Sequence, residues 1–302
     1  MAAKTRVAIA GASGVTGSSI VNALLATPRN SYVEIPFPLA RQASINKPAY
    51  VAFANRGVII KPIELDGPSD ILVQALTGMD VVISTMTLLQ LKEETALIEA
   101  AHKARIEGGH TGSHQKALPT LHCHRLWLVV STLPAVPAIG TTPRQGEYST
   151  TQIVGDGNTP WALTDNRDIG KYVARIIVDP RTLNRAVFGY SKVWTQTEVF
   201  DLLEKVTGES VPREYVTKEE LLEIISEGEA EIAKNNMDPS GMLKLGMAQY
   251  RNLLGIRGDN TPQHAKYLGY LDVKELYPDV EATPLESYIK DAFEGKVKTV
   301  YS

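Results

Sequence analysis

The heptapeptide GASGVTG, residues 11–17, contains three glycines at a spacing of three. It follows the short apolar run Arg6–Ala10 and precedes SSIVNALLATP, whose apolar residues recur at helical spacing. A strand, a glycine-rich turn and a helix in this order are what a dinucleotide phosphate site requires. Gly11 would permit the tight turn, Gly14 would let the backbone approach a pyrophosphate, and Gly17 would let the helix pack close to the strand.

The start of the expected helix supplies groups that bind an anion. Its free backbone N–H groups and positive dipole end favour phosphate, Ser13 and Thr16 can add hydroxyl donors, and Val15 belongs to the same cofactor-binding turn. The first glycine gap is one residue longer than in the usual G-x-G-x-x-G pattern. Because glycine pairs are common in turns, a turn that binds nothing is the alternative interpretation.

A second strand is expected within residues 32–42, where Pro36 and Pro38 would make it irregular or place it near a sheet edge. Arg41 stands at its end and Lys47 follows shortly after. A site for NAD would place Asp or Glu here to hold the ribose 2′-hydroxyl, whereas arginine pairs with a 2′-phosphate. The sequence therefore favours NADPH over NADH, with a solvated surface arginine as the alternative.

The chain around these motifs alternates between the two kinds of secondary structure. Strands are expected in 57–66 and 80–86, and helices in 67–78 and 88–105. This alternation predicts an α/β fold with a doubly wound, parallel sheet of Rossmann type. Ligands of such sheets bind at the carboxyl ends of the strands. Asp66 is therefore expected near the adenine, and Thr85 and Met86 near the nicotinamide, although each could equally be a plain loop residue.

The bulk composition is that of an ordinary soluble globular protein. The 302 residues are 43% hydrophobic and 22% charged, with a net charge of −3. This charge gives no electrostatic argument for nucleic acid or an anionic membrane as partner. The one cysteine excludes an intrachain disulfide and fits a reducing compartment. With no leader pattern and no apolar stretch of membrane-spanning length, the expected location is the cytoplasm.

From about residue 155 the chain becomes more helical. TQTE at 195–198 and TKEE at 217–220 both fit capping boxes. We expect an NAD(P)-binding domain over residues 1–154, atypical in 108–130, and a smaller, mostly helical substrate domain over 155–302. A small-molecule substrate would bind in the cleft between them, and the oligomeric state is not indicated.

Six motifs spread along the chain belong together. The front motifs are GASGVTG, Arg41 and LDGPSDILVQALTGMDVVIS, and the rear ones are GDGNTPWALTDNRDIGKYVARIIVDPRTLN, VFGYSKVWTQTEVFDLLEKVTGE and GIRGDNTPQHAKYLGYLDVKELYPD. Through these motifs the chain resembles the NmrA-like and isoflavone reductase-like group of atypical short-chain dehydrogenases, in its fungal branch. The resemblance implies NADPH-dependent reduction of a carbonyl or conjugated double bond in a small phenolic or polyketide-like secondary metabolite. Some members are not enzymes, so a non-catalytic, NAD(P)-sensing regulatory protein of NmrA type is the second hypothesis.

The resemblance fails over about residues 105–131. Members of the family have a fifth apolar strand here, and then a lysine-bearing helix. In this chain the next strand-like run is Leu126–Val130, after a run of small, polar and histidine residues. From Gly108 to Gly146, 39 residues contain no Asp or Glu, although 34 acidic residues in 302 would give about four.

The segment 108–127, GGHTGSHQKALPTLHCHRLW, contains four of the six histidines and the only cysteine. A metal site is disfavoured, because GGHTGSH is a poor helix for pairing His110 with His114. Two interpretations stay open: a divergent active-site loop, and a misspliced or out-of-frame insert. In the first, Lys116 is the only lysine near the family's lysine, and it becomes the candidate for stabilising negative charge on a substrate oxygen.

Overall fold

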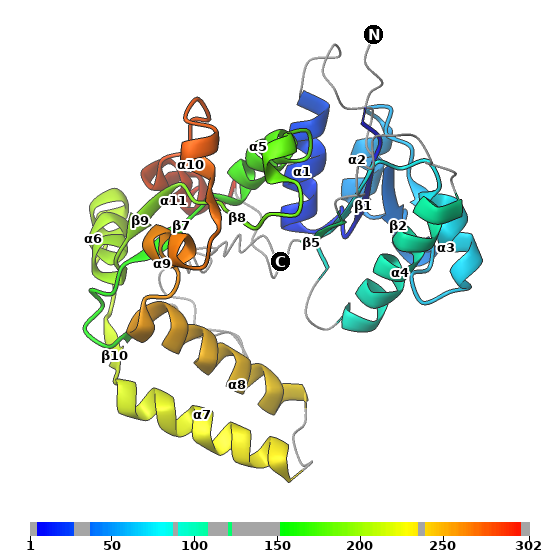
Figure 1. Ribbon diagram of the computed structural model, residues 1–302. Coiled ribbons are helices and arrows are strands. Elements are labelled where there is room, and N and C mark those ends of the chain that lie inside the picture. The colour runs from blue at the N-terminus through cyan, green and yellow to red at the C-terminus, as the bar shows by residue number, and fades with distance from the viewer. Residues whose placement is uncertain are drawn as a thin grey trace. The chain divides into compact units, whose positions relative to one another are not determined.

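The computed structural model describes residues 5–26, 37–86, 90–107, 120–122, 152–234 and 239–296 (Figure 1). The chain divides into two compact units. The first holds the described residues up to 122 together with 166–189 and 270–281, and the second holds 152–165, 190–269 and the described residues from 282 onward. The domain boundary expected after residue 154 remains a prediction.

The first unit is built on a parallel, five-stranded sheet in the order β3-β2-β1-β4-β5. Its elements are β1 (Val7–Ala10), α1 (Val15–Ala26), β2 (Phe37–Ala40), α2 (Pro48–Ala54), β3 (Lys61–Pro62), α3 (Ser69–Leu76), β4 (Val81–Ser84), α4 (Leu91–Glu107), β5 (Thr120–His122), α5 (Asn166–Ile176), β8 (Val187–Phe188), β11 (Leu271–Asp272) and α10 (Val273–Leu276). The predicted Rossmann-type, doubly wound sheet is therefore confirmed.

The two central strands are buried because helices cover both faces of the sheet. Every residue of β1 and β4 is buried. Helices α3 and α4 pack on one face, where Ala8, Ala10 and Val82 share a core with Leu72, Leu97 and neighbouring side chains. Helices α1 and α5 lie together on the other face (Figure 1). This two-sided cover explains why both strands read as continuous apolar runs.

Two strands need comment against their predictions. β2 lies directly beside the edge strand β3, in agreement with the expected position near a sheet edge, and it is paired on both sides. Pro38 is tolerated because β3 pairs only with Leu39 and Ala40, so the missing N–H interrupts no bond to β3. The strand after α4 lies at Thr120–His122 and pairs with β4, within a segment expected to be a connection. The apolar run 126–130, where that strand was expected, lies outside the described residues.

Helices α1 and α5 approach each other closely at Gly170. A side chain at this position would place its Cβ 2.2 Å from the backbone oxygen of Ser19. The Gly170 N–H donates to Ser19 Oγ at 3.0 Å, and Ser19 Oγ donates to the Arg167 carbonyl at 3.1 Å. Only glycine permits this contact, which joins residues far apart in the sequence.

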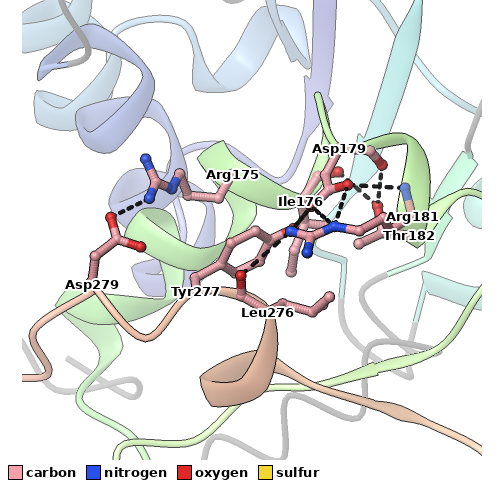
Figure 2. Close-up of polar contacts among 8 residues, drawn as sticks. All are labelled: Arg175, Ile176, Asp179, Arg181, Thr182, Leu276, Tyr277 and Asp279. Atoms are coloured by element: carbon pink, nitrogen blue, oxygen red, sulfur yellow. Dashed lines mark hydrogen bonds and ion pairs between the residues drawn. The ribbon is translucent and has the colours of Figure 1, made fainter.

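A polar cluster secures α5 to the later segment that carries Tyr277 (Figure 2). Arg181 donates to both carboxylate oxygens of Asp179, over 2.7 and 3.0 Å, and the Tyr277 hydroxyl donates to the same carboxylate over 2.9 Å. The guanidinium carbons of Arg175 and Arg181 each lie 5.8 Å from the Tyr277 ring centre. Arg175 also pairs with Asp279. The cluster is structural, since each charge has a partner within it.

The second unit is mostly helical. Its elements are β6 (Gln152–Val154), β7 (Trp161–Leu163), β9 (Lys192–Trp194), α6 (Gln196–Thr207), β10 (Glu214–Val216), α7 (Lys218–Ala233), α8 (Pro239–Asn252), η4 (Leu253–Arg257), α9 (Pro262–Tyr267) and α11 (Leu285–Phe293). Both predicted capping boxes are confirmed, at Thr195 with Glu198 and at Thr217 with Glu220. Among the described residues, no helix is long and apolar enough to cross a membrane.

Gly170→Ala should lower the free energy of unfolding by about 1–3 kcal/mol, because the added methyl group must push two helix backbones apart. Gly246→Ala in α8 is the matched control, since a Cβ there meets nothing within 4 Å. It should be neutral or should stabilise the helix by up to about 1 kcal/mol. Urea unfolding of both variants measures the difference. Equal stability of the two variants would contradict the close contact between α1 and α5.

Asp179→Asn should destabilise the protein in a pH-dependent way. The Arg181 hydrogen bonds hold the pKa of Asp179 at about 2, below its usual value of 3.8. A depressed pKa stabilises the fold above the unfolded-state value, and this contribution is lost as the pH falls from about 4 towards 2. The stability difference between wild type and variant, measured by urea unfolding, should therefore be smaller at about pH 3 than at about pH 6. A difference independent of pH would mean that the charge of Asp179 contributes nothing.

Candidate functional site

The topological switch point of the sheet lies between β1 and β4. The chain continues from β1 to β2 on one side, and from β4 to β5 on the other. At this point the backbone N–H and the Oγ1 of Thr85 both donate to the Ala10 carbonyl, over 3.0 and 2.9 Å. In open α/β sheets, ligands bind outside the strand ends at such a point. The Gly11–Gly17 turn begins directly after Ala10, so the structure places the predicted phosphate-binding turn there.

The three glycines of the turn are required for different reasons. Gly11 has a positive φ of 80°, and a Cβ on it would lie 2.5 Å from Thr85 Oγ1. A Cβ on Gly17 would lie 2.3 Å from the Gly11 carbonyl oxygen, so its close contact is with the turn rather than with the strand. Gly14 is exposed, and a Cβ there would meet only the Gly11 oxygen, at 3.3 Å. Of the three glycines, Gly14 is therefore the one whose replacement by a larger residue would disturb the packing of the protein least.

The remaining residues of the turn leave donors available. Ser13 and Thr16 are half-buried, and their hydroxyl groups have no hydrogen-bond partner within the described part of the chain. Val15 is also half-buried and is the first residue of α1. Helix α1 has no acidic residue in its first turn to oppose an anion. The free N–H groups at its N-terminus can therefore donate hydrogen bonds to phosphate oxygens at the carboxyl ends of the strands.

The end of β2 carries two exposed cations. Arg41 directly follows the strand, and Lys47 directly precedes α2. In the described ranges, neither side chain has a hydrogen bond or an ion pair. Between them, the Gln42 N–H donates to the Glu64 carboxylate at 2.8 Å, which secures this loop to the end of β3. Both cations are therefore available for the 2′-phosphate that the sequence suggested.

Two other predicted site residues, Asp66 and Met86, differ in whether a ligand could reach their side chains. Asp66 is exposed in the turn after β3, where its carboxylate faces solvent. Met86 is only 6% exposed, and its side chain packs in the core beneath α3 and α4. The Met86 side chain is therefore not exposed at the carboxyl ends of the strands, and only the Met86 backbone remains for contact with a ligand. The hydroxyl of Thr85 is similarly committed to the Ala10 carbonyl.

A buried pair at the same strand end was missed by the sequence analysis. Ser84 Oγ donates to Glu94 Oε1 at 2.9 Å, with Ser84 2% and Glu94 7% exposed. A glutamate in the first turn of a helix reads as a solvated, dipole-favoured residue. Its position relative to Leu97 and Ala101, three and seven residues later and both buried, was the signal that it faces inward.

Much of the segment 108–127 is not described, apart from β5 at 120–122. Lys116, the predicted catalytic residue, lies outside the described residues, and so do His110, His114 and Cys123. Among the residues that are described, no group of three or more His, Cys, Asp or Glu side chains could hold a metal ion.

Curated relatives cover nearly the whole chain. Asnovolin J 5′,6′-dehydrogenase of Aspergillus novofumigatus is 39% identical over 318 aligned positions, which cover 96% of this chain and 95% of that protein. Phenylcoumaran benzylic ether reductase of Betula pendula is 27% identical and covers 96% of this chain and 99% of that protein. The relatives named here are a dehydrogenase and a reductase.

Solved structures show the same fold. Leucoanthocyanidin reductase from Vitis vinifera, in complex with NADPH, superposes with a TM-score of 0.68 at 20% identity, covering 96% of this chain and 99% of that one. The sequence model of the NmrA-like family matches residues 3–108 and 132–289 and skips the stretch between them. That gap lies within residues 105–131, where the sequence departs from the pattern of its relatives. The resemblance is confirmed: this chain belongs to the NmrA-like family.

Proposed function

We propose that the chain is an NADPH-dependent oxidoreductase that acts on a carbonyl or conjugated double bond of a small phenolic or polyketide-like molecule. The observation that carries the proposal is the exposed Gly14 of the Gly11–Gly17 turn. A Cβ at Gly14 would meet a single protein atom at 3.3 Å, so the fold itself makes little demand for glycine. A pyrophosphate that approaches the backbone supplies the missing reason.

The charges around the turn match the same ligand. Arg41 and Lys47 are exposed at the end of β2, where a Rossmann-type sheet holds the adenosine ribose. An arginine there that pairs with none of the described side chains favours the 2′-phosphate of NADPH over the bare hydroxyl of NADH. The set of donors suited to the phosphates is completed by the N-terminus of α1 and by the hydroxyls of Ser13 and Thr16, which bond to none of the described residues.

The curated relatives support the reaction class and the substrate class. The 39% identical fungal protein is named as a dehydrogenase of asnovolin J, and the birch protein as a reductase of a benzylic ether. Both names describe redox chemistry on a small organic molecule. The alignments with this chain span at least 95% of the length of each relative. The redox activity of the whole relative, and not of one part of it, is therefore the activity proposed for this chain.

The protein would contribute binding, orientation and charge stabilisation. When bound, NADPH supplies the hydride. The Gly11–Gly17 turn and Arg41 hold the two phosphate regions, and the ends of β1 and β4 direct the remainder of the dinucleotide to the switch point. Lys116 is the candidate for stabilising negative charge that develops on the substrate oxygen.

Arg41→Ala should weaken NADPH binding roughly tenfold to a hundredfold, the usual range for a lost charged hydrogen bond, and should leave NADH binding nearly unchanged. Titration with each cofactor, followed by its fluorescence, measures both dissociation constants. Lys103→Ala on the exposed face of α4 is the control and should change neither. Equal losses for NADPH and NADH would remove the assignment of Arg41 to the 2′-phosphate. Failure of the wild type to bind either cofactor would overturn the proposed function.

Lys116→Ala should lower kcat by about 10²-fold or more, in the range of a lost oxyanion donor, while the dissociation constant for NADPH stays the same. Turnover of quinones, enones and hydroxylated aromatics with NADPH measures the first quantity, and titration measures the second. An unchanged kcat would exclude Lys116 from the chemistry while leaving the cofactor site intact.

A further inference from the structure

The first residue of α5 carries a buried polar atom that the fold itself does not use. Asn166 is 6% exposed, and its Oδ1 atom is buried without a hydrogen-bond partner among the described residues. An amide oxygen that loses water and gains no donor destabilises the folded chain. A hydrogen bond from a bound ligand would remove this cost.

Asn166 lies beside the start of α1, because α1 and α5 run parallel to each other. The Arg167 carbonyl accepts from Ser19 Oγ. One turn further along α5, a Cβ on Gly170 would meet both Ser19 and Ala23. The contacts thus advance in the same direction along both helices, which brings their first turns together. Asn166 precedes Gly170 by one turn on the same face of α5.

Thr16 has the matching position on α1. It precedes Ser19 by three residues and Ala23 by seven, on the side of α1 that contacts α5. Its hydroxyl bonds to no other residue in the described part of the chain. Two polar side chains that lack described partners therefore lie in adjacent first helical turns. Both are at the carboxyl end of the sheet, because α1 starts there, directly after the Gly11–Gly17 turn.

Helix α5 lies on the flank of α1 that is away from the adenosine end of the site. Arg56, which follows α2, donates to Asn22 on the other flank of α1. Helix α2 connects β2 with β3, and Arg41 is at the end of β2, so α1 lies between α2 and α5 (Figure 1). A dinucleotide crosses the switch point from the β2 side, with its pyrophosphate over the start of α1. The first turn of α5 is therefore beside the part that follows the pyrophosphate, which is the nicotinamide ribose.

We propose that Asn166 binds the nicotinamide ribose, with its Oδ1 accepting a hydrogen bond from a ribose hydroxyl. This inference rests on the proposed function. Ribose hydroxyls are donors and an amide oxygen is an acceptor, so the ligand supplies the group that the buried oxygen lacks. The amide is also uncharged. It therefore does not repel the neighbouring phosphates, as a carboxylate at the same position would.

The test compares two fragments of the cofactor that differ by this ribose. 2′-Phospho-ADP-ribose contains it, whereas 2′-phospho-ADP ends at the pyrophosphate. Asn166→Ala should weaken binding of the first fragment roughly threefold to tenfold, the scale of one neutral hydrogen bond, and should leave the second unchanged. Calorimetry measures both dissociation constants. Asn55→Ala, the same substitution at the exposed C-cap of α2, is the control and should change neither.

The two dissociation constants separate a lost contact from damage to the fold. Equal weakening of both fragments, or no weakening of either, would overturn the inference while the proposed function stands. If the Ala variant does not fold, Asn166→Leu replaces the amide by an apolar group of similar shape, and the same comparison decides. If the wild type binds neither fragment and no NADPH, the proposed function itself has failed, and this inference fails with it.

Discussion

The junction of β1 and β4 is the contact on which the rest of the first unit depends. The Ala10 carbonyl accepts both the N–H and the Oγ1 of Thr85, and a Cβ on Gly11 would lie within 2.5 Å of that same hydroxyl oxygen. The turn cannot carry a side chain at Gly11 without separating the two central strands. The Gly11–Gly17 turn also determines where α1 begins, and therefore the direction in which the free N–H groups of α1 point. The contact between Thr85 and Ala10 therefore links the pairing of the two central strands to the geometry of the proposed phosphate site.

The order of the front elements could be predicted because local patterns were enough. Apolar runs of strand length, a glycine turn and amphipathic segments identify parallel α/β units without knowledge of distant contacts. The capping boxes at Thr195 and Thr217 were equally local. Pro38 indicated a position near the sheet edge but not the exact pairing, because its cost depends on how far β3 extends beside it, and the length of a two-residue neighbour cannot be inferred from the sequence of β2.

The features that escaped prediction depend on contacts between distant parts of the chain. Residues 166–189 and 270–281 belong to the first unit, held there by Gly170 against Ser19 and by the cluster around Tyr277. No local pattern identifies such partners. Met86 was assigned to the site from its place after a strand, but its side chain alternates into the core. Glu94 was overlooked because an acidic residue in a first helical turn reads as solvated, although it is buried against Ser84.

The two exposed cations beside β2 differ from the buried carboxylate at the end of β4 in how strongly solvent and salt screen them. Arg41 and Lys47 are exposed, whereas Glu94 is 7% exposed and accepts from Ser84 Oγ. Salt screens exposed charges more strongly than buried ones. The contribution that Arg41 and Lys47 would make to the preference for NADPH over NADH should therefore decrease as the ionic strength rises, whereas the hydrogen bond between Ser84 and Glu94 would change little.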